Sequence, residues 1–128
     1  MDETVGRHRR ARIRGFVVAG PSMRPGLEHG DRIVATPIGR RVRRGWRCVV
    51  EHPERPGFWL VKRIGAGPGE GVPGSQAGRV VPPGHLYVLS DDPAPEHVDS
   101  RTFGPVPMAG GYRVRFRLPR RRDRVAAR

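Results

Sequence analysis

Short runs of apolar residues, each followed by a cluster of turn residues, divide the chain into segments of strand length. The runs lie at 15–19, 32–36, 47–51, 58–64, 79–81, 86–89 and 112–118. Glycine and proline stand between them, for example in Pro25-Gly26 and Pro56-Gly57. Short apolar runs bounded by such residues are typical of β-strands joined by loops. The pattern therefore predicts an all-β protein.

The clearest two-residue alternation lies at 112–118. Apolar side chains at every second position predict one buried face, and the arginines between them predict a face in solvent. The apolar positions are Tyr112, Val114, Phe116 and Leu118, and the arginines are Arg113, Arg115 and Arg117. The only helical segment expected is a single turn at 22–27, because Pro25 and Gly26 limit its length.

The chain has 128 residues, which is enough for one compact domain. Its 18 glycines and 14 prolines favour a loop-rich β structure over a helix bundle. We expect one domain over 13–118, a basic arm over 1–12 and a basic tail over 119–128. The single cysteine, Cys48, excludes an internal disulfide and a thiolate metal cluster, and agrees with a reducing, cytoplasmic compartment.

The formal net charge of +13 comes mainly from arginine clusters at 7–14, 40–47 and 113–124. Such clusters near chain ends are typical of solvated arms. Attraction to nucleic acid or an anionic membrane surface is the alternative, although no aromatic side chains interleave the terminal runs to stack bases. The apolar run at 16–19 is too short to span a bilayer. The five histidines stand singly, so no metal site is expected.

One lysine, Lys62, stands among 24 arginines. A guanidinium keeps its proton at physiological pH, whereas a desolvated amine can lose it near neutrality. A two-residue period places Lys62 on the same face as Phe58, Leu60 and Ile64. An amine among these apolar side chains suits a general base. The ordinary alternative is a lysine that extends along a half-exposed strand into solvent.

The candidate nucleophile is Ser22, in the turn Gly20-Pro-Ser-Met-Arg-Pro-Gly-Leu27. A serine held in a tight turn after a strand presents its hydroxyl and backbone N–H to a cleft, and Pro21 stiffens the turn. Taken alone, this sequence also fits a purely structural turn. Ser22 and Lys62 are thus the candidates for a Ser–Lys dyad, and no Ser–His–Asp triad is evident in the sequence.

Four segments, in order, resemble the type I signal peptidase superfamily of serine–lysine proteases. They are the Ser22 turn, His29-Gly-Asp-Arg-Ile-Val-Ala35, Leu60-Val-Lys-Arg-Ile-Gly-Ala-Gly-Pro-Gly-Glu70, and Tyr87-Val-Leu-Ser-Asp-Asp92 with Val98-Asp-Ser-Arg-Thr-Phe-Gly104. The resemblance covers about residues 15–118. Within the superfamily, the run at 99–107 is most similar to the maturation proteases of nickel-type superoxide dismutase.

The resemblance implies one barrel-like, all-β domain that cuts a short N-terminal leader from a precursor, here that of a nickel-type superoxide dismutase. It implies a protein substrate and no cofactor for the protease itself. Ser22 becomes the nucleophile and, through its backbone N–H, an oxyanion donor, while Lys62 becomes the general base. The supporting residues that it implies are Asp31, Arg63, Asp99, Ser100 and Arg101.

The chain departs from the family pattern in three segments. The family's Gly-Asp-Asn is Ser90-Asp91-Asp92 here, and Gly20 replaces a hydroxyl residue two positions before the nucleophile. His97 replaces the serine that hydrogen-bonds the lysine amine, so we expect it either beside Lys62 or in solvent. The alternatives to dismutase maturation are a general leader peptidase, a self-cleaving repressor-type protease, and an inactive module that binds nucleic acid or an acidic partner.

Overall fold

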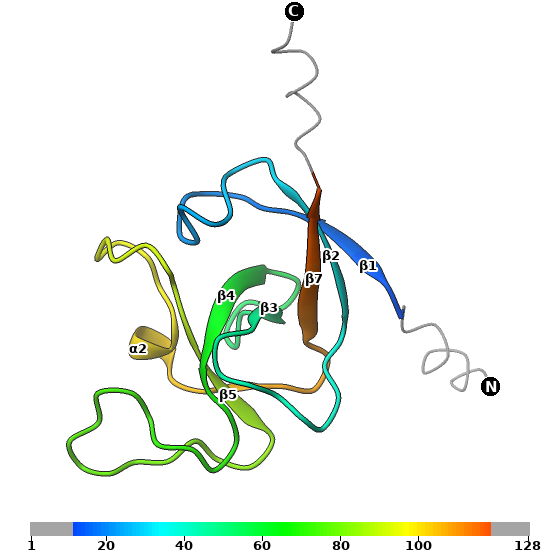
Figure 1. The fold of residues 1–128 in the computed structure, drawn as a ribbon. Helices are drawn as coiled ribbons and strands as arrows, with labels where there is room; N and C mark the ends of the chain where they lie inside the picture. Colours follow the sequence, from blue (N-terminus) through cyan, green and yellow to red (C-terminus); the bar gives the residue numbers. More distant parts are fainter. Residues whose placement is uncertain (1–11, 119–128) are drawn as a thin grey trace, which may run out of the picture.

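The computed structural model describes residues 12–118 and confirms the all-β prediction (Figure 1). Two expected segments lie outside the described residues: the basic tail at 119–128, and the basic arm at 1–12 except for Arg12. The strands are β1 (Arg14–Val17), β2 (Arg32–Pro37), β3 (Arg47–Glu51), β4 (Trp59–Ala66), β5 (His85–Leu89), β6 (Val106–Pro107) and β7 (Tyr112–Leu118). A short helix, α2 (Ser100–Phe103), lies between β5 and β6.

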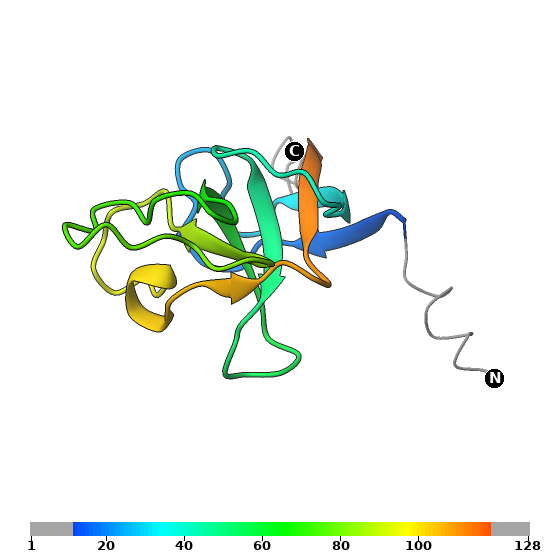
Figure 2. The same ribbon diagram turned by 90° about the horizontal axis from the view of Figure 1, so that it is seen from below.

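The strands form one antiparallel sheet in the order β1-β2-β7-β3-β4-β5-β6. The sheet curls into a half-barrel, as the views in Figures 1 and 2 show. Because of this curl, β1 and β4 line the same cavity although they are not neighbours in the sheet. The barrel-like fold expected from the sequence is therefore confirmed.

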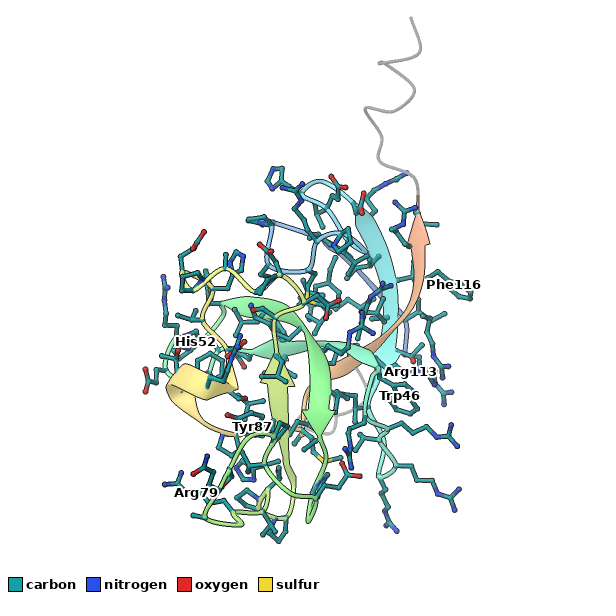
Figure 3. All side chains as sticks on the ribbon, turned by 60° about the vertical axis from the view of Figure 1, so that its left-hand side comes forward. Trp46, His52, Arg79, Tyr87, Arg113 and Phe116 are labelled. Atoms are coloured by element: carbon teal, nitrogen blue, oxygen red, sulfur yellow. The ribbon has the colours of Figure 1, made fainter. Side chains whose placement is uncertain are left out.

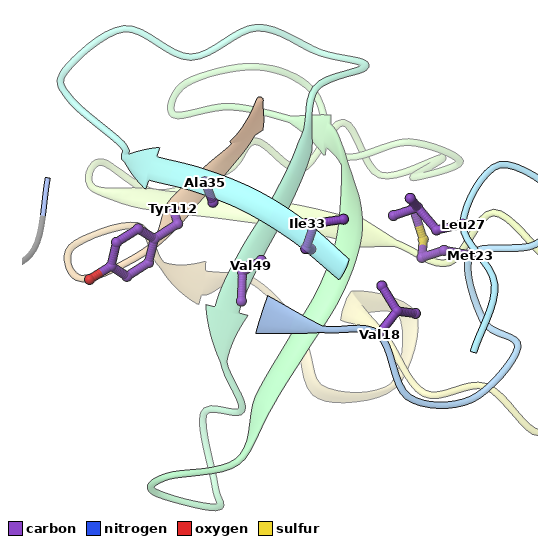
Figure 4. Close-up of a cluster of buried hydrophobic side chains, with 7 residues drawn as sticks. All are labelled: Val18, Met23, Leu27, Ile33, Ala35, Val49 and Tyr112. Carbon is purple, nitrogen blue, oxygen red and sulfur yellow. The ribbon is translucent and has the colours of Figure 1, made fainter. Parts of the chain in front are cut away.

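The hydrophobic core anchors the loop between β1 and β2. Met23 and Leu27, both fully buried, extend from this loop into a cluster with side chains of β2, β3 and β7 (Figure 4). Burying a side chain of this size stabilises the fold by about 1.5–3 kcal/mol. The members of the cluster are Val18, Met23, Leu27, Ile33, Ala35, Val49 and Tyr112. The loop that carries Ser22 is thus fixed by its own apolar residues.

One predicted strand is absent from the structure over 12–118, and one predicted turn is present. The segment 79–81 forms no strand, and Val80 makes only an isolated bridge with Gly71. The expected turn at 22–27 is present as a single hydrogen-bonded turn, in which the Leu27 N–H donates to the Met23 carbonyl at 3.0 Å. Two elements, α2 and β6, have no counterpart in the sequence pattern.

The prediction for 112–118 is correct at the start of β7 and wrong at its end. Ala35 pairs with Val114, but Val34 pairs with Phe116, so Arg115 is an extra residue on β7. Such a bulge turns the following side chains to the opposite face. Phe116 consequently points away from the sheet and is 65% exposed (Figure 3). Arg117 pairs with the buried Ile33 and lies on the inner face instead.

Candidate active site

The loop that carries Ser22 is closed at its base by backbone hydrogen bonds. The Val18 N–H donates to the Asp31 carbonyl and the Gly30 N–H donates to the Val18 carbonyl, both at 2.8 Å. The Asp31 side chain, 1% exposed, accepts the Glu28 N–H at 2.8 Å and lies 3.5 Å from an Arg117 nitrogen. Asp31 therefore lies where a structural residue of the loop is expected.

Gly20 occupies a backbone conformation that favours glycine, with φ at +82°. Its N–H donates to Nδ1 of His29 at 3.0 Å. A residue with a side chain would be strained at this φ. This conformation gives a physical reason why no hydroxyl residue stands two positions before Ser22.

Lys62 lies on the inner face of β4, as the two-residue period predicts. Burial alternates along the whole strand, and Leu60, Lys62 and Ile64 are 8%, 3% and 1% exposed. Phe58, expected on the same face, lies just before β4 and is 43% exposed. Burial lowers the pKa of the Lys62 amine; the Asp99 carboxylate opposes this shift and the Arg101 guanidinium adds to it. A neutral amine is favoured here more than on the protein surface.

Three consecutive residues connect the Lys62 strand to the Ser22 loop. The Lys62 Nζ donates to the Ser90 Oγ at 2.8 Å. The Arg63 guanidinium forms a two-pronged ion pair with Asp91, at 2.8 and 2.6 Å. The backbone N–H of Asp92 then donates to the Ser22 carbonyl at 2.9 Å. The segment 90–92 therefore connects Lys62, the candidate base, to Ser22, the candidate nucleophile.

The segment Asp99-Ser100-Arg101 forms hydrogen bonds with the backbone of Ser90 and of β5. Asp99 accepts the Ser90 N–H at 2.9 Å and binds the Arg101 guanidinium at 2.7 Å. The buried Ser100 Oγ accepts the Val88 N–H at 2.8 Å. Burial alone would raise the pKa of Asp99, but its hydrogen bonds with Arg101 and Ser90 outweigh burial, and the pKa is lowered. A carboxylate remains charged in this interior position because Arg101 and two backbone N–H groups stabilise it.

His97 lies neither at the lysine amine nor in solvent. Its side chain is 7% exposed, and its Nε2 lies 2.8 Å from the Asp92 Oδ2. The hydroxyl at the amine belongs to Ser90 instead. Sequence reasoning missed the roles of Ser90 and Asp92, although a signal was present. The signal is that Ser90 stands where the family has glycine, while His97 stands where the family has serine. The two departures together suggest that the hydroxyl has moved from one position to the other.

Ser22 and Lys62 both line one cavity, which has a volume of about 180 Å³. Within residues 12–118 no hydrogen bond joins the two side chains, and the amine donates to Ser90. The remaining lining is apolar: Phe16, Val17, Val18, Ala19, Ile33, Val49, Phe58, Trp59, Leu60 and Val61. The structure thus brings together a hydroxyl, a buried amine and an apolar pocket.

Two strand edges border this cavity without a partner in the part of the chain that the structure describes. β1 pairs only with β2. Residues 59–62 of β4 pair with β3 on one side, whereas the pairing with β5 begins at Arg63. Unpaired strand edges offer backbone N–H and C=O groups to an extended peptide. The site can therefore receive a peptide as an added strand.

Comparison with protein families matches residues 5–77 to the family described as signal peptidase, peptidase S26. The match spans more than half of the chain, and the chain belongs to this family of serine peptidases. It includes Ser22 and Lys62 and ends before the segment 90–101.

A curated relative is the mitochondrial inner membrane protease subunit 1 of Xenopus tropicalis. It is 29% identical over 102 residues, which cover 73% of this chain and 60% of that protein. The chain therefore spans about 60% of the length of this relative. The match supports the peptidase superfamily that the sequence motifs resemble.

Over 12–118 there is no helix with the length and apolar character needed to cross a membrane. The same part of the chain contains no group of three or more His, Cys, Asp or Glu side chains that could hold a metal ion.

Proposed function

We propose that the chain is a serine endopeptidase in which Ser22 is the nucleophile and Lys62 the general base, and that it removes an N-terminal leader from a precursor protein. The observation that carries this proposal is the buried Lys62, whose pKa is lowered, on the same cavity as Ser22. A lysine acts as a base only when neutral, and burial favours that form. Membership of the signal peptidase family supports the reaction class.

The proposed reaction is acyl transfer. Neutral Lys62 takes the proton of Ser22 as its Oγ bonds to the scissile carbonyl carbon, and the Ser22 backbone N–H binds the oxyanion. Collapse of this intermediate breaks the C–N bond, and Lys62 returns the proton to the leaving amine. Water then attacks the acyl-enzyme, with Lys62 again taking and returning one proton, and releases the leader and free Ser22.

The reaction requires the Ser22 hydroxyl and the Lys62 amine to form a hydrogen bond, which they do not form in the structure of residues 12–118. Catalytic hydrogen bonds are commonly long before substrate binds and shorten in the complex. A leader that lies as a strand between the edges of β1 and β4 would exclude water from this cavity. Loss of water strengthens the polar contacts of the dyad and further favours the neutral amine.

For the substrate, we propose the precursor of a nickel-type superoxide dismutase, with processing in the cytoplasm. The resemblance of the run at 99–107 to the maturation proteases of that enzyme supports this substrate. In this proposal nickel belongs to the product of cleavage, and the protease binds none.

The test uses the purified full-length chain and two substrates, the dismutase precursor and an unrelated protein with a leader. Products are identified by mass spectrometry. Ser22→Ala and Lys62→Arg are each expected to lower the rate by about 10³-fold or more, because the dyad acts as a unit and Arg cannot lose its proton. Arg79→Gln, an exposed charge outside the site, serves as the control.

The outcomes separate the parts of the proposal. Equal cleavage of both substrates would replace dismutase maturation with a general leader peptidase. Full activity of Lys62→Arg would refute the dyad. A folded wild-type chain that cuts neither substrate would identify an inactive homologue.

A further inference from the structure

His97 has a buried side chain in a loop that is otherwise largely exposed. Pro93, Pro95 and Glu96 are exposed, whereas the His97 side chain is 7% exposed and its Nε2 lies 2.8 Å from the Asp92 Oδ2. A His–carboxylate contact at this distance is a hydrogen bond that restricts both side chains. The loop 93–97 is therefore folded back onto Asp92 by this pair.

Asp92 in turn contacts the candidate nucleophile directly. Its N–H donates to the Ser22 carbonyl at 2.9 Å. This hydrogen bond links the segment 90–103 to the loop 19–30. A hydrogen bond to the carbonyl of Ser22 orients its peptide plane and thereby the Cα to which the hydroxyl is attached. This contact acts together with the buried Met23 and Leu27 to set the position of Ser22 relative to Lys62.

The residues around Asp92 hold its backbone in the required orientation. Pro93 biases Asp92 toward extended geometry, because the proline ring excludes the helical region for the residue before it. On the other side, Asp91 is held by the Arg63 guanidinium. His97 supplies the restraint that these two neighbours do not, since it holds the Asp92 side chain itself.

We propose that His97 and Asp92 form a positioning pair for the nucleophile. His97 holds the Asp92 side chain, and the Asp92 N–H holds the Ser22 carbonyl so that the hydroxyl points toward the Lys62 amine. Ser90 engages that amine, which leaves His97 available for this separate role. The proposal rests on the proposed function of Ser22. It assigns His97 no direct contact with substrate or with Lys62.

A purely structural ion pair would have a different signature from a positioning pair. Loss of a structural contact lowers stability and leaves the kinetic constants of the folded fraction unchanged. Loss of a positioning contact lowers kcat with little change in KM, because the substrate still binds while the nucleophile is misdirected. Misplacement by about 1 Å can cost on the order of 100-fold in rate.

The kinetic test compares His97→Leu, which removes the hydrogen bond and retains bulk, with His97→Gln, whose amide can still donate to Asp92. For His97→Leu we expect kcat to fall about 10- to 100-fold while KM changes by less than about 3-fold. His97→Gln should recover most of this loss. The matched control is His85→Leu, because the His85 Nδ1 lies 2.9 Å from the neighbouring Pro83 carbonyl oxygen and the residue does not line the cavity of Ser22 and Lys62.

A double mutant tests whether the two residues act together. Asp92→Ala combined with His97→Leu should be no slower than Asp92→Ala alone, since residues that act through one contact are not additive. Wild-type kcat in folded His97→Leu would overturn the proposal. An equal loss of kcat in His85→Leu would overturn it as well.

Amide hydrogen exchange tests the contact without relying on activity. It is measured on the full chain, in the Ser22→Ala background and with added His97→Leu. The Asp92 amide should be protected in the first protein and exchange at least about 10-fold faster in the second, because its hydrogen bond is then released more often. Equal protection would overturn the positioning pair, whatever the outcome for the peptidase reaction. Conversely, wild-type cleavage by Ser22→Ala would refute the proposed function and leave this measurement valid.

Discussion

Replacement of Asp99 should weaken the fold by an amount that follows from its contacts. Asp99 is 1% exposed and accepts the N–H groups of Ser90 and Arg101, the latter at the start of α2. Loss of a buried acceptor costs about 1–3 kcal/mol, and loss of a helix N-cap about 0.5–2 kcal/mol. The Arg101 side chain is 55% exposed, so its ion pair adds little. Asp99→Ala should therefore lower the free energy of unfolding by about 1.5–5 kcal/mol.

Asp99→Asn separates the structural from the electrostatic role of this residue. Asparagine is as good an N-cap as aspartate, so the loss of stability should be smaller. The Asp99 carboxylate raises the pKa of Lys62 against the effect of burial. Its neutralisation should let this pKa fall further, and the rise of kcat/KM with pH should move to lower pH.

The assays are urea denaturation of both variants and pH–rate profiles of wild type and Asp99→Asn. An Asp99→Ala protein within about 0.5 kcal/mol of wild type would contradict the estimate, because that is the range of ordinary surface substitutions. A kcat/KM profile that moves to higher pH in Asp99→Asn would show that Asp99 does not act electrostatically on Lys62.

Three further predictions concern buried residues. Lys62→Met should stabilise the protein near pH 7, because the native state disfavours the charged amine. The gain in stability, measured by denaturation at several pH values, should shrink as the pH approaches 10.5, because the lysine of the unfolded chain loses its proton there. Leu27→Ala should cost about 2–5 kcal/mol in the same assay, and a cost near zero would show that Leu27 does not anchor the Ser22 loop. The Cys48 thiol, fully buried with its pKa raised to about 12, should react with a thiol reagent at pH 8 only after denaturation.

The sequence by itself predicted the class of fold, which the structure confirms, and singled out Ser22 and Lys62 as the two central candidates of the site. Strand positions follow from local alternation of apolar and polar side chains, which each strand imposes independently of its partners. Lys62 stood out because its face of the strand is apolar and every other basic residue is arginine. The Ser22 turn was recognisable because glycine and proline restrict the backbone locally.

Only the tertiary structure decided which side chains support Ser22 and Lys62. Ser90, rather than His97, contacts the lysine amine, and Asp92 contacts Ser22 through its backbone. These contacts join residues 28 and 70 positions apart in sequence. The bulge that exposes Phe116 likewise depends on the pairing of β7 with β2. Local periodicity carries no information about such pairings, because they are set by the register of distant strands and by the packing of loops across the cavity.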